Sequence, residues 1–341
     1  MTSAEPLLAH EPVARRIVFR REFGVAGLLA LMFAAAGIVN PAFLTTGNVT
    51  DMLVQCVPAL IVGCGLLFVI ITGEIDISVG SLFGFLAALM GVLASPQRLG
   101  LTFGMVAAGT LAAGAAVGLV NGLLVTLGRV PSIIATLGML SALRGATELL
   151  MGGEWITDLP PALRTLGAGN WLRIPLSIWT AAICLLLALW LAHRTPLGRR
   201  LYAIGSNPEA ARMAGLPITS AKLLAFTLTG LLTAVAALVS VPQLGVIESG
   251  LGVGFELVVV TAVVVGGASI RGGSGTVAGM LLAVLLLGTI RTVLLFLKLG
   301  DAAVYWERAI QGAFIIAAVL LDRAGHGKPS PNPGAPGAGV S

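Results

Sequence analysis

Two carboxylates lie between apolar runs in the segment Thr72–Ser81, which reads TGEIDISVGS. Glu74 and Asp76 are ionisable groups in apolar surroundings, where a charge is costly unless it lines a substrate or ion path or orders a helix break. The flanking glycines allow unusual backbone angles, and Ser78 and Ser81 are suited to capping a following helix. Two interpretations follow: an acid that lines a path or orders a broken helix, or a simple solvated turn.

Other charged and polar side chains also fall inside long apolar runs. Arg144 and Glu148 are four residues apart, a spacing that places them on one helix face, where they can pair. Arg291 lies in a later run, and Asn121 and Glu256 are weaker candidates of the same kind. Each either contacts a polar substrate or tethers one helix to another.

The sequence lacks the residues that several kinds of chemistry require. The chain has no phosphate-binding loop motif, since Gly327-Lys328 is followed by Pro329. We therefore expect no ATP hydrolysis, no cofactor and no enzymatic activity in this chain. The histidines are scattered and the odd number of cysteines argues against a disulfide framework, so we expect no metal site. These residues are His10, His193, His326, Cys56, Cys64 and Cys184.

The composition of the 341 residues shows what must position these groups. Apolar residues make up 57% of the chain and charged residues 10%, against about 25% in soluble domains. So few charges cannot cover a globule in water, and the chain requires a lipid bilayer as its solvent. The net charge of +5 is scattered between apolar blocks, which argues against a nucleic-acid partner.

Apolar runs along the chain predict an all-α polytopic membrane protein of about ten transmembrane helices. The first run, 23–39, is interpreted as a retained helix, with a cleaved signal peptide as the alternative. Two runs, 77–94 and 255–268, are short and border Gly-rich polar interruptions, which predicts broken or re-entrant segments. The remaining runs are 52–72, 101–127, 133–152, 175–192, 223–242, 277–297 and 305–321.

The distribution of positive charge predicts the orientation. With ten alternating spans and an internal N-terminus, 13 of the 20 Lys and Arg residues lie inside and five outside, which obeys the positive-inside rule. We therefore expect both termini in the cytoplasm. The predicted organisation is an N-terminal cytoplasmic segment 1–22, a transmembrane domain 23–322 and a disordered cytoplasmic tail 323–341.

The inner loop 194–222 contains the pattern of a short capped helix. Asn207 suits the N-cap, Pro208 the first helical position and Glu209 the positive end of the helix dipole, while Gly215 suits the stop. A helix of about two turns is not stable alone, so it is expected to dock on a partner or to lie on the lipid surface.

Two segments of the chain are weakly similar to each other. One apolar run leads into GEIDISVGS at 73–81 and another into GGASIRGGS at 266–274, each followed by a further apolar run. Transporters are often built from two related halves with discontinuous helices, so we predict two weakly related halves.

Four sequence blocks together resemble the sugar-type permeases of bacterial ATP-binding-cassette (ABC) importers, the ribose, rhamnose, xylose and autoinducer group, which is related to branched-chain amino-acid permeases. The resemblance runs from about residue 25 to 322, and the four blocks stand in the family's order. Glu74 departs from the pattern, because the family often has Gly there. The blocks are TGEIDISVGS at 72–81, NGLL with VPSIIATLGM and Arg144-Gly145, the inner-loop residues Gly205, Asn207, Glu209, Ala210, Ala211 and Gly215, and VGGASIRGGSG at 265–275.

This resemblance implies a transmembrane subunit in the bacterial inner membrane that imports a sugar of rhamnose, ribose or autoinducer type. It implies three partners: a separate ATPase subunit that binds ATP and docks on the inner loop, a periplasmic sugar-binding protein, and a second permease copy or paralogue. The candidate path residues are Glu74, Asp76, Ser78, Asn121, Arg144, Glu148 and Arg291. The rival functions are an ion-coupled secondary transporter using Glu74, Asp76, Arg144 and Glu148, and an uncoupled channel or membrane scaffold.

Overall fold

A computed structural model describes residues 13–296 and 302–325 of the chain, and nearly all of the described residues are helical. The α-helices are α1 (Val13–Val39), α2 (Thr46–Ile71), α3 (Val79–Ala94), α4 (Phe103–Thr126), α5 (Ser132–Met151), α6 (Pro161–Ala168), α7 (Leu176–Arg194), α8 (Pro196–Ser206), α9 (Pro208–Met213), α10 (Ile218–Ser240), α11 (Phe255–Val265), α12 (Val277–Phe296) and α13 (Ala302–Gly325). Two short 3-10 helices, η1 (Pro41–Leu44) and η2 (Val241–Gln243), and the hairpin β1 (Asn170–Trp171) and β2 (Ile174–Pro175) complete the elements.

Each of the ten predicted apolar runs corresponds to a helix, so the expected all-α polytopic fold is confirmed. In the described part of the chain, α1, α2, α4, α5, α7, α10 and α12 are long and apolar enough to cross a membrane. The two runs that were expected to be short form α3 and α11, of 16 and 11 residues. At 1.5 Å per residue these span only about 24 and 16 Å, less than the hydrocarbon core of ~30 Å.

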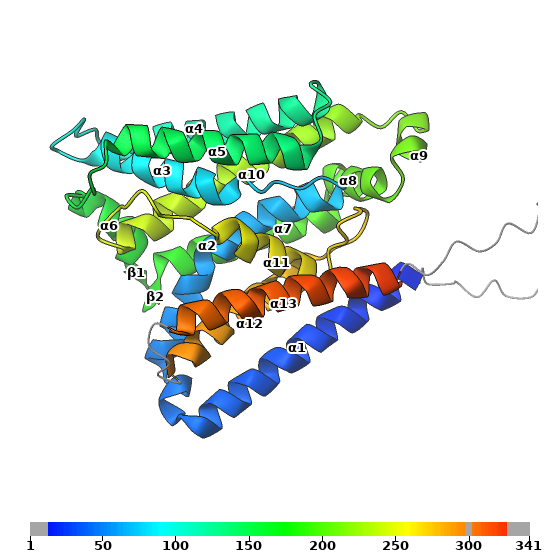
Figure 1. Ribbon diagram of the computed structural model, residues 1–341, viewed down its shortest axis with the longest axis horizontal. Helices are drawn as coiled ribbons and strands as arrows, with labels where there is room; N and C mark the ends of the chain where they lie inside the picture. The colour runs from blue at the N-terminus through cyan, green and yellow to red at the C-terminus, as the bar shows by residue number, and fades with distance from the viewer. Residues whose placement is uncertain (1–12, 297–301, 326–341) are drawn as a thin grey trace, which may run out of the picture.

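The helices lie side by side in three groups (Figure 1). α3, α4 and α5 form one side of the bundle, α2, α7, α10 and α11 the middle, and α1, α12 and α13 the other side. α2 is the central helix, because 83% of its apolar window is buried, whereas 6% of the α1 window is buried. A helix that is apolar all round and buried is expected at the core of a membrane bundle.

Glycines spaced four residues apart let α4 and α10 approach closely. Gly114, Gly118 and Gly122 form one stripe on α4, and a methyl group on any of them would collide with α10. Gly230 of α10 is equally tight against Gly114 and Gly118. Small residues at such contacts allow the van der Waals packing and close backbone approach that hold helices together in lipid.

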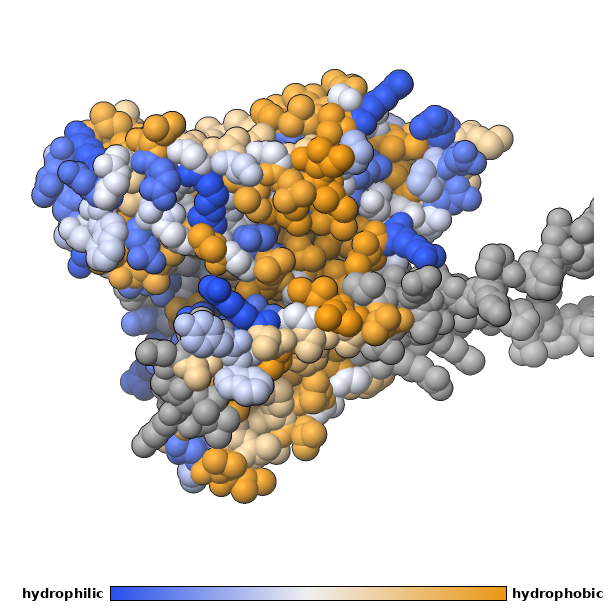
Figure 2. Space-filling view, in the orientation of Figure 1, coloured by the Kyte–Doolittle hydropathy of each residue, from blue (hydrophilic) through white to orange (hydrophobic). Residues whose placement is uncertain are grey.

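The surface separates into an apolar middle and two hydrophilic ends (Figure 2). α6 and the hairpin lie at one end, and α8 and α9 at the other (Figure 1). The start of α1 and the end of α13 share the end that holds α8 and α9. α1 begins inside the predicted N-terminal segment 1–22 and α13 extends to Gly325, whereas 326–341 of the predicted tail lie outside the described residues.

Candidate functional site

The first helix break, residues 72–78, separates α2 from α3 and is ordered by Asp76. The carboxylate Oδ1 of Asp76 accepts hydrogen bonds from the Ser78 main-chain N–H at 2.9 Å and from the Ser78 hydroxyl at 2.6 Å. Asp76 is 2% exposed, which excludes a solvated turn at this position. The expectation that Ser78 caps α3 is wrong: its side chain makes no capping bond, because its hydroxyl is occupied by Asp76.

Asn121 of α4 joins the same buried cluster. Its Nδ2 donates to the Ser78 hydroxyl at 2.9 Å and lies 3.5 Å from Oδ2 of Asp76, while its Oδ1 has no partner within the protein. Asp76, Ser78 and Asn121, three of the predicted path residues, are therefore brought together. Their network is almost completely shielded from solvent, so they hold the break from within.

Two hydroxyls of α5 support the break from the other side. The main-chain N–H of Ile75 donates to the Ser132 hydroxyl at 3.2 Å, and that of Ile77 donates to the Thr136 hydroxyl at 3.3 Å. Irregular backbone at membrane depth needs such partners, because lipid supplies none. Ser132 and Thr136 were missed from the sequence, although their four-residue spacing at the start of an apolar run places them on one helix face.

Glu74 turns away from this cluster towards the start of α10. Its carboxylate forms an ion pair with Lys222, and the two side chains are 17% and 18% exposed. Lys222 is not among the path residues that the sequence predicts. Glu74 and Asp76 therefore have different surroundings although they are two residues apart.

The second break, residues 266–276, separates α11 from α12 and meets the first. The N–H of Gly273 donates to the main-chain oxygen of Ile71 at 2.8 Å, and Gly272 packs against the backbone of Gly73. Gly272 and Gly273 have φ of 91° and 77°, angles that only glycine adopts freely. The two weakly similar segments of the sequence are thus in contact in the fold.

The predicted capped helix of the inner loop is α9. The Asn207 side chain accepts the N–H of Ala210 at 3.0 Å, Pro208 opens the helix, and Gly215 follows it with φ of 71°. Glu209 and Ala210 are exposed and Ala211 is buried, so most of α9 lies at the surface of the chain.

The helix α8, which immediately precedes α9, was not predicted. Gly205 was expected in the loop, but it lies buried in α8, where a methyl group would overlap the main-chain oxygen of Ile71. The Tyr202 hydroxyl donates to the oxygen of Gly275 at 2.7 Å, and the Ser206 hydroxyl lies 3.5 Å from the oxygen of Gly273. Burial raises the pKa of Tyr202 to about 12. α8 therefore contacts the end of α2 and the second break together.

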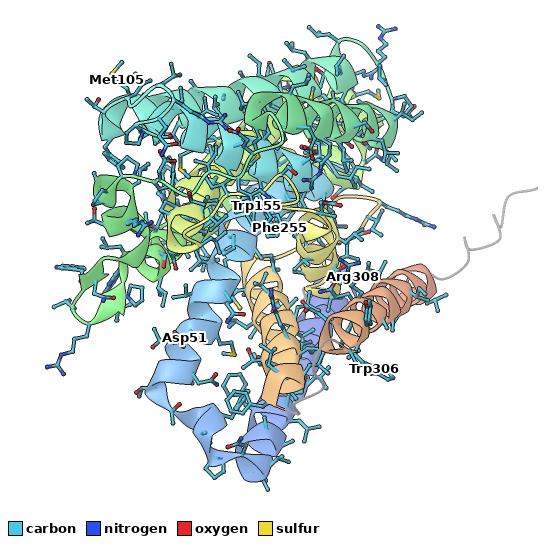
Figure 3. The ribbon with its side chains drawn as sticks, turned by 60° about the vertical axis from the view of Figure 1, so that its left-hand side comes forward. Asp51, Met105, Trp155, Phe255, Trp306 and Arg308 are labelled. Carbon is cyan, nitrogen blue, oxygen red and sulfur yellow. The ribbon has the colours of Figure 1, made fainter. Side chains whose placement is uncertain are left out.

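A second feature missed from the sequence is the re-entrant segment 244–254 between η2 and α11. It starts at the end of the bundle opposite α9, yet the Leu251 oxygen packs against Gly84 in the second turn of α3. Arg144 of α5 donates from Nη1 to that oxygen at 2.9 Å. At the start of α11, Phe255 (Figure 3) contacts Phe83 of α3 with 5.1 Å between ring centroids.

The guanidinium of Arg144 thus donates its hydrogen bond to a main-chain oxygen. Glu148 and Glu256 are close enough to interact with it electrostatically. The possible Arg144–Glu148 ion pair does not form, however. In the described structure no carboxylate oxygen of Glu148 lies within 4 Å of a guanidinium nitrogen of Arg144. Glu148 is exposed on the same face of α5 as Gly138 and Gly145.

Arg291 lies apart from the other candidates. Its side chain is 59% exposed, and its Nε is 3.8 Å from the carboxylate of Glu307 on α13. The structure places it as a contact between α12 and α13, outside both helix breaks. Among the described residues no group of three His, Cys, Asp or Glu side chains could hold a metal ion.

Comparison with known proteins identifies the family of the chain. Residues 48–319 match the family model described as the permease component of the branched-chain amino acid transport system. The chain belongs to this permease family. The permease is 33% identical over 300 residues to the autoinducer 2 import system permease protein of Photorhabdus laumondii, covering 87% of this chain and 88% of the relative.

Two further relatives have similar identity. The ribose import permease protein of Escherichia coli K12 is 34% identical over 298 residues, covering 86% of the permease and 91% of the relative. The autoinducer 2 import system permease protein of Salmonella paratyphi B is 34% identical over 297 residues, covering 86% and 84%. No solved structure matches the permease. The matches extend over both breaks and the α8–α9 segment, so they cover the whole site described above.

Proposed function

We propose that the permease is the transmembrane subunit of an ABC importer and forms the translocation path for a sugar. A periplasmic binding protein delivers the sugar, and a separate ATPase subunit binds and hydrolyses ATP. The names of the ribose and autoinducer 2 relatives support the substrate class. The observation that carries the proposal is α9: a capped helix, exposed outside the spanning helices, whose neighbour α8 contacts the end of α2 and the second helix break.

α9 has the properties of a docking element. It has six residues, too few for a helix to be stable without a partner. Met213 at its end is 91% exposed at the hydrophilic end of the molecule, where a large apolar side chain is costly to leave in water. A protein partner on this surface would bury Met213, and Glu209 and Arg212 would provide polar contacts around it.

The proposed path runs along the exposed face of α5. Gly138, Ser141, Gly145 and Glu148 are all exposed there, a small and polar surface that lipid does not favour. A second permease copy or paralogue against this face would enclose Glu148 and the re-entrant segment held by Arg144. Asp76, Ser78 and Asn121 act from the interior, where they fix the first break in the geometry that borders this path.

The orientation of the permease in the membrane follows from the arginines of α8 and α9. α8 and α9 carry Arg199, Arg200 and Arg212, and they share one end of the bundle with the start of α1 and the end of α13 (Figure 1). The positive-inside rule assigns this end to the cytoplasm. The permease would then lie in the bacterial inner membrane with both termini inside, and α6 and the hairpin would face the binding protein.

Transport then follows from a shift between two conformations. ATP binding by the partner moves α9, and α8 transmits this movement to the end of α2 and to the glycine-rich second break. The bundle alternates between outward-open and inward-open states. The permease supplies the path and its two breaks, and the partner supplies the free energy of ATP.

Reconstitution tests the proposal directly. Proteoliposomes that contain the permease, its ATPase and the binding protein should accumulate ribose or autoinducer 2 only with ATP, and omission of any one partner should abolish uptake. Uptake by the permease alone that is abolished by a proton or sodium ionophore would establish the secondary-transporter alternative. Downhill flux that needs neither ATP nor an ion gradient would establish a channel.

The docking role of α9 has its own test. Glu209→Lys and Gly215→Val change exposed positions of α9 and its stop, and both should reduce co-purification of the ATPase while the permease keeps its gel-filtration profile. Glu154→Lys is the matched control, because Glu154 is an exposed acid in the connection from α5 to α6, and α6 lies at the end of the bundle opposite α9 (Figure 1). Full co-purification of both α9 variants would remove the docking role from this helix.

A further inference from the structure

The segment from α8 to the start of α10 holds each helix break by a separate polar contact. At its beginning, the Tyr202 hydroxyl donates to the oxygen of Gly275 in the second break, at 2.7 Å. At its end, Lys222 forms an ion pair with Glu74 in the first break. α9 lies between these two contacts. A displacement of α9 therefore reaches both breaks, each through its own side chain.

The Glu74–Lys222 pair differs from an ordinary surface ion pair. Exposed pairs contribute little, because water screens them and long side chains lose entropy. Here both side chains are more than four-fifths buried, and an unpaired charge left in such a position is strongly unfavourable. Glu74 also follows Gly73, whose φ of 80° is one that glycine adopts without strain. The pair thus joins the start of the first break to the segment that runs from α8 to the start of α10.

The Tyr202 contact is the counterpart at the second break. Gly272, Gly273 and Gly275 all have positive φ, conformations that glycine adopts without strain. The phenolic hydroxyl lies on α8, whose Gly205 is wedged against the end of α2. α8 therefore contacts this loop through the Tyr202 hydroxyl, at 2.7 Å from the Gly275 oxygen, and through the more distant Ser206 hydroxyl, at 3.5 Å from the Gly273 oxygen.

We propose that Glu74, Lys222 and Tyr202 are positioning residues for transport, which make the first and second helix breaks follow the movement of α9. The Glu74–Lys222 pair serves the first break and the Tyr202 hydroxyl serves the second. This inference rests on the proposed function, because the movement of α9 comes from the ATPase. It adds that the two breaks are driven through separable contacts.

The test measures each break separately in the assembled permease–ATPase complex. The native cysteines Cys56, Cys64 and Cys184 are buried, so a cysteine placed at Ile75 in the first break or at Ile270 in the second reports maleimide labelling of that break. The measured quantity is the ratio of labelling rates with and without ATP plus vanadate. In the otherwise unaltered chain this ratio should differ from one at both positions.

Each variant should affect one break. Glu74→Gln and Lys222→Met should bring the ratio at Ile75 towards one, roughly a 2- to 30-fold loss of the nucleotide effect, and leave the ratio at Ile270 unchanged. Tyr202→Phe should bring the ratio at Ile270 towards one and leave the ratio at Ile75 unchanged. The exchange Glu74→Lys with Lys222→Glu should restore the response at Ile75. Glu154→Gln and Tyr305→Phe are the matched controls, since both residues are exposed and distant from the breaks.

The outcomes separate this inference from the proposed function. If nucleotide changes labelling at neither break of the unaltered chain while the ATPase is bound, the coupling of α9 to the bundle fails, and the inference fails with it. If the unaltered chain responds and the variants respond equally at both breaks, the proposed function stands and the positioning role is overturned. A simultaneous loss at both breaks in every variant would show a general structural defect, which also overturns it.

Discussion

The N–H of Gly273 donates to the main-chain oxygen of Ile71 across 2.8 Å, although the two residues belong to opposite halves of the chain. Ile71 is the last residue of α2, where a main-chain oxygen has no partner within its own helix. The second break thus completes the hydrogen bonding at the end of α2, and α8 packs on this junction through Gly205.

Gly205→Val should disrupt this junction. The side chain would overlap the Ile71 oxygen and also approach Gly273, so α8 must move away. We expect a loss of about 1–3 kcal/mol in unfolding free energy, as for other overpacked sites, seen as a lower melting temperature in detergent. Gly138→Ala is the control, because no atom lies within 4 Å of the added methyl group. Equal melting temperatures for both variants would contradict the close packing at Gly205.

Asp76→Ala should destabilise the permease more than Asp76→Asn. The alanine variant leaves the Ser78 N–H buried without an acceptor, which costs about 1–3 kcal/mol, whereas the amide oxygen of asparagine can still accept it. Thermal unfolding of the two variants measures the difference. If the asparagine variant is as unstable as the alanine variant, the charge of Asp76, and not its hydrogen bond to Ser78, is what orders the break.

The helices could be predicted from the sequence because lipid forces each long apolar run to satisfy its own backbone. α9 could be predicted for a different reason: Asn207, Pro208 and Gly215 act on their immediate neighbours, so the cap and the stop are local. The position of the first break was also predictable, since Asp76 interrupts an apolar run at high cost.

The contacts that make up the site could not be predicted, because they join residues that are distant in the chain. Nothing near Lys222 indicates Glu74 as its partner, and nothing near Arg144 indicates the Leu251 oxygen. The local spacing favoured Glu148 instead. α8 was missed because it begins with Thr195-Pro196 and carries Arg199 and Arg200, so it resembles a polar loop until its buried face is known.

Arg144→Met should release the re-entrant segment. The Leu251 oxygen loses its donor at 2.9 Å, and the segment then depends on its packing against α3. A cysteine at Leu251 should therefore react faster with maleimide in the Arg144→Met background than in the unaltered one. Glu148→Gln is the control, because Glu148 forms no bond to this segment. An unchanged labelling rate in Arg144→Met would show that the hydrogen bond does not hold the segment in place.

Tyr202 should titrate at unusually high pH. Burial raises its pKa to about 12, from an ordinary value of about 10. Because the folded pKa is the higher one, the fold favours the protonated hydroxyl: this contribution to stability is complete below about pH 10 and is lost as pH rises towards 12. Absorbance of phenolate at 295 nm measures the titration. Tyr202→Phe should remove the phase near pH 12. Retention of the high-pH phase in that variant would show that the Tyr202 hydroxyl is not the buried donor to Gly275.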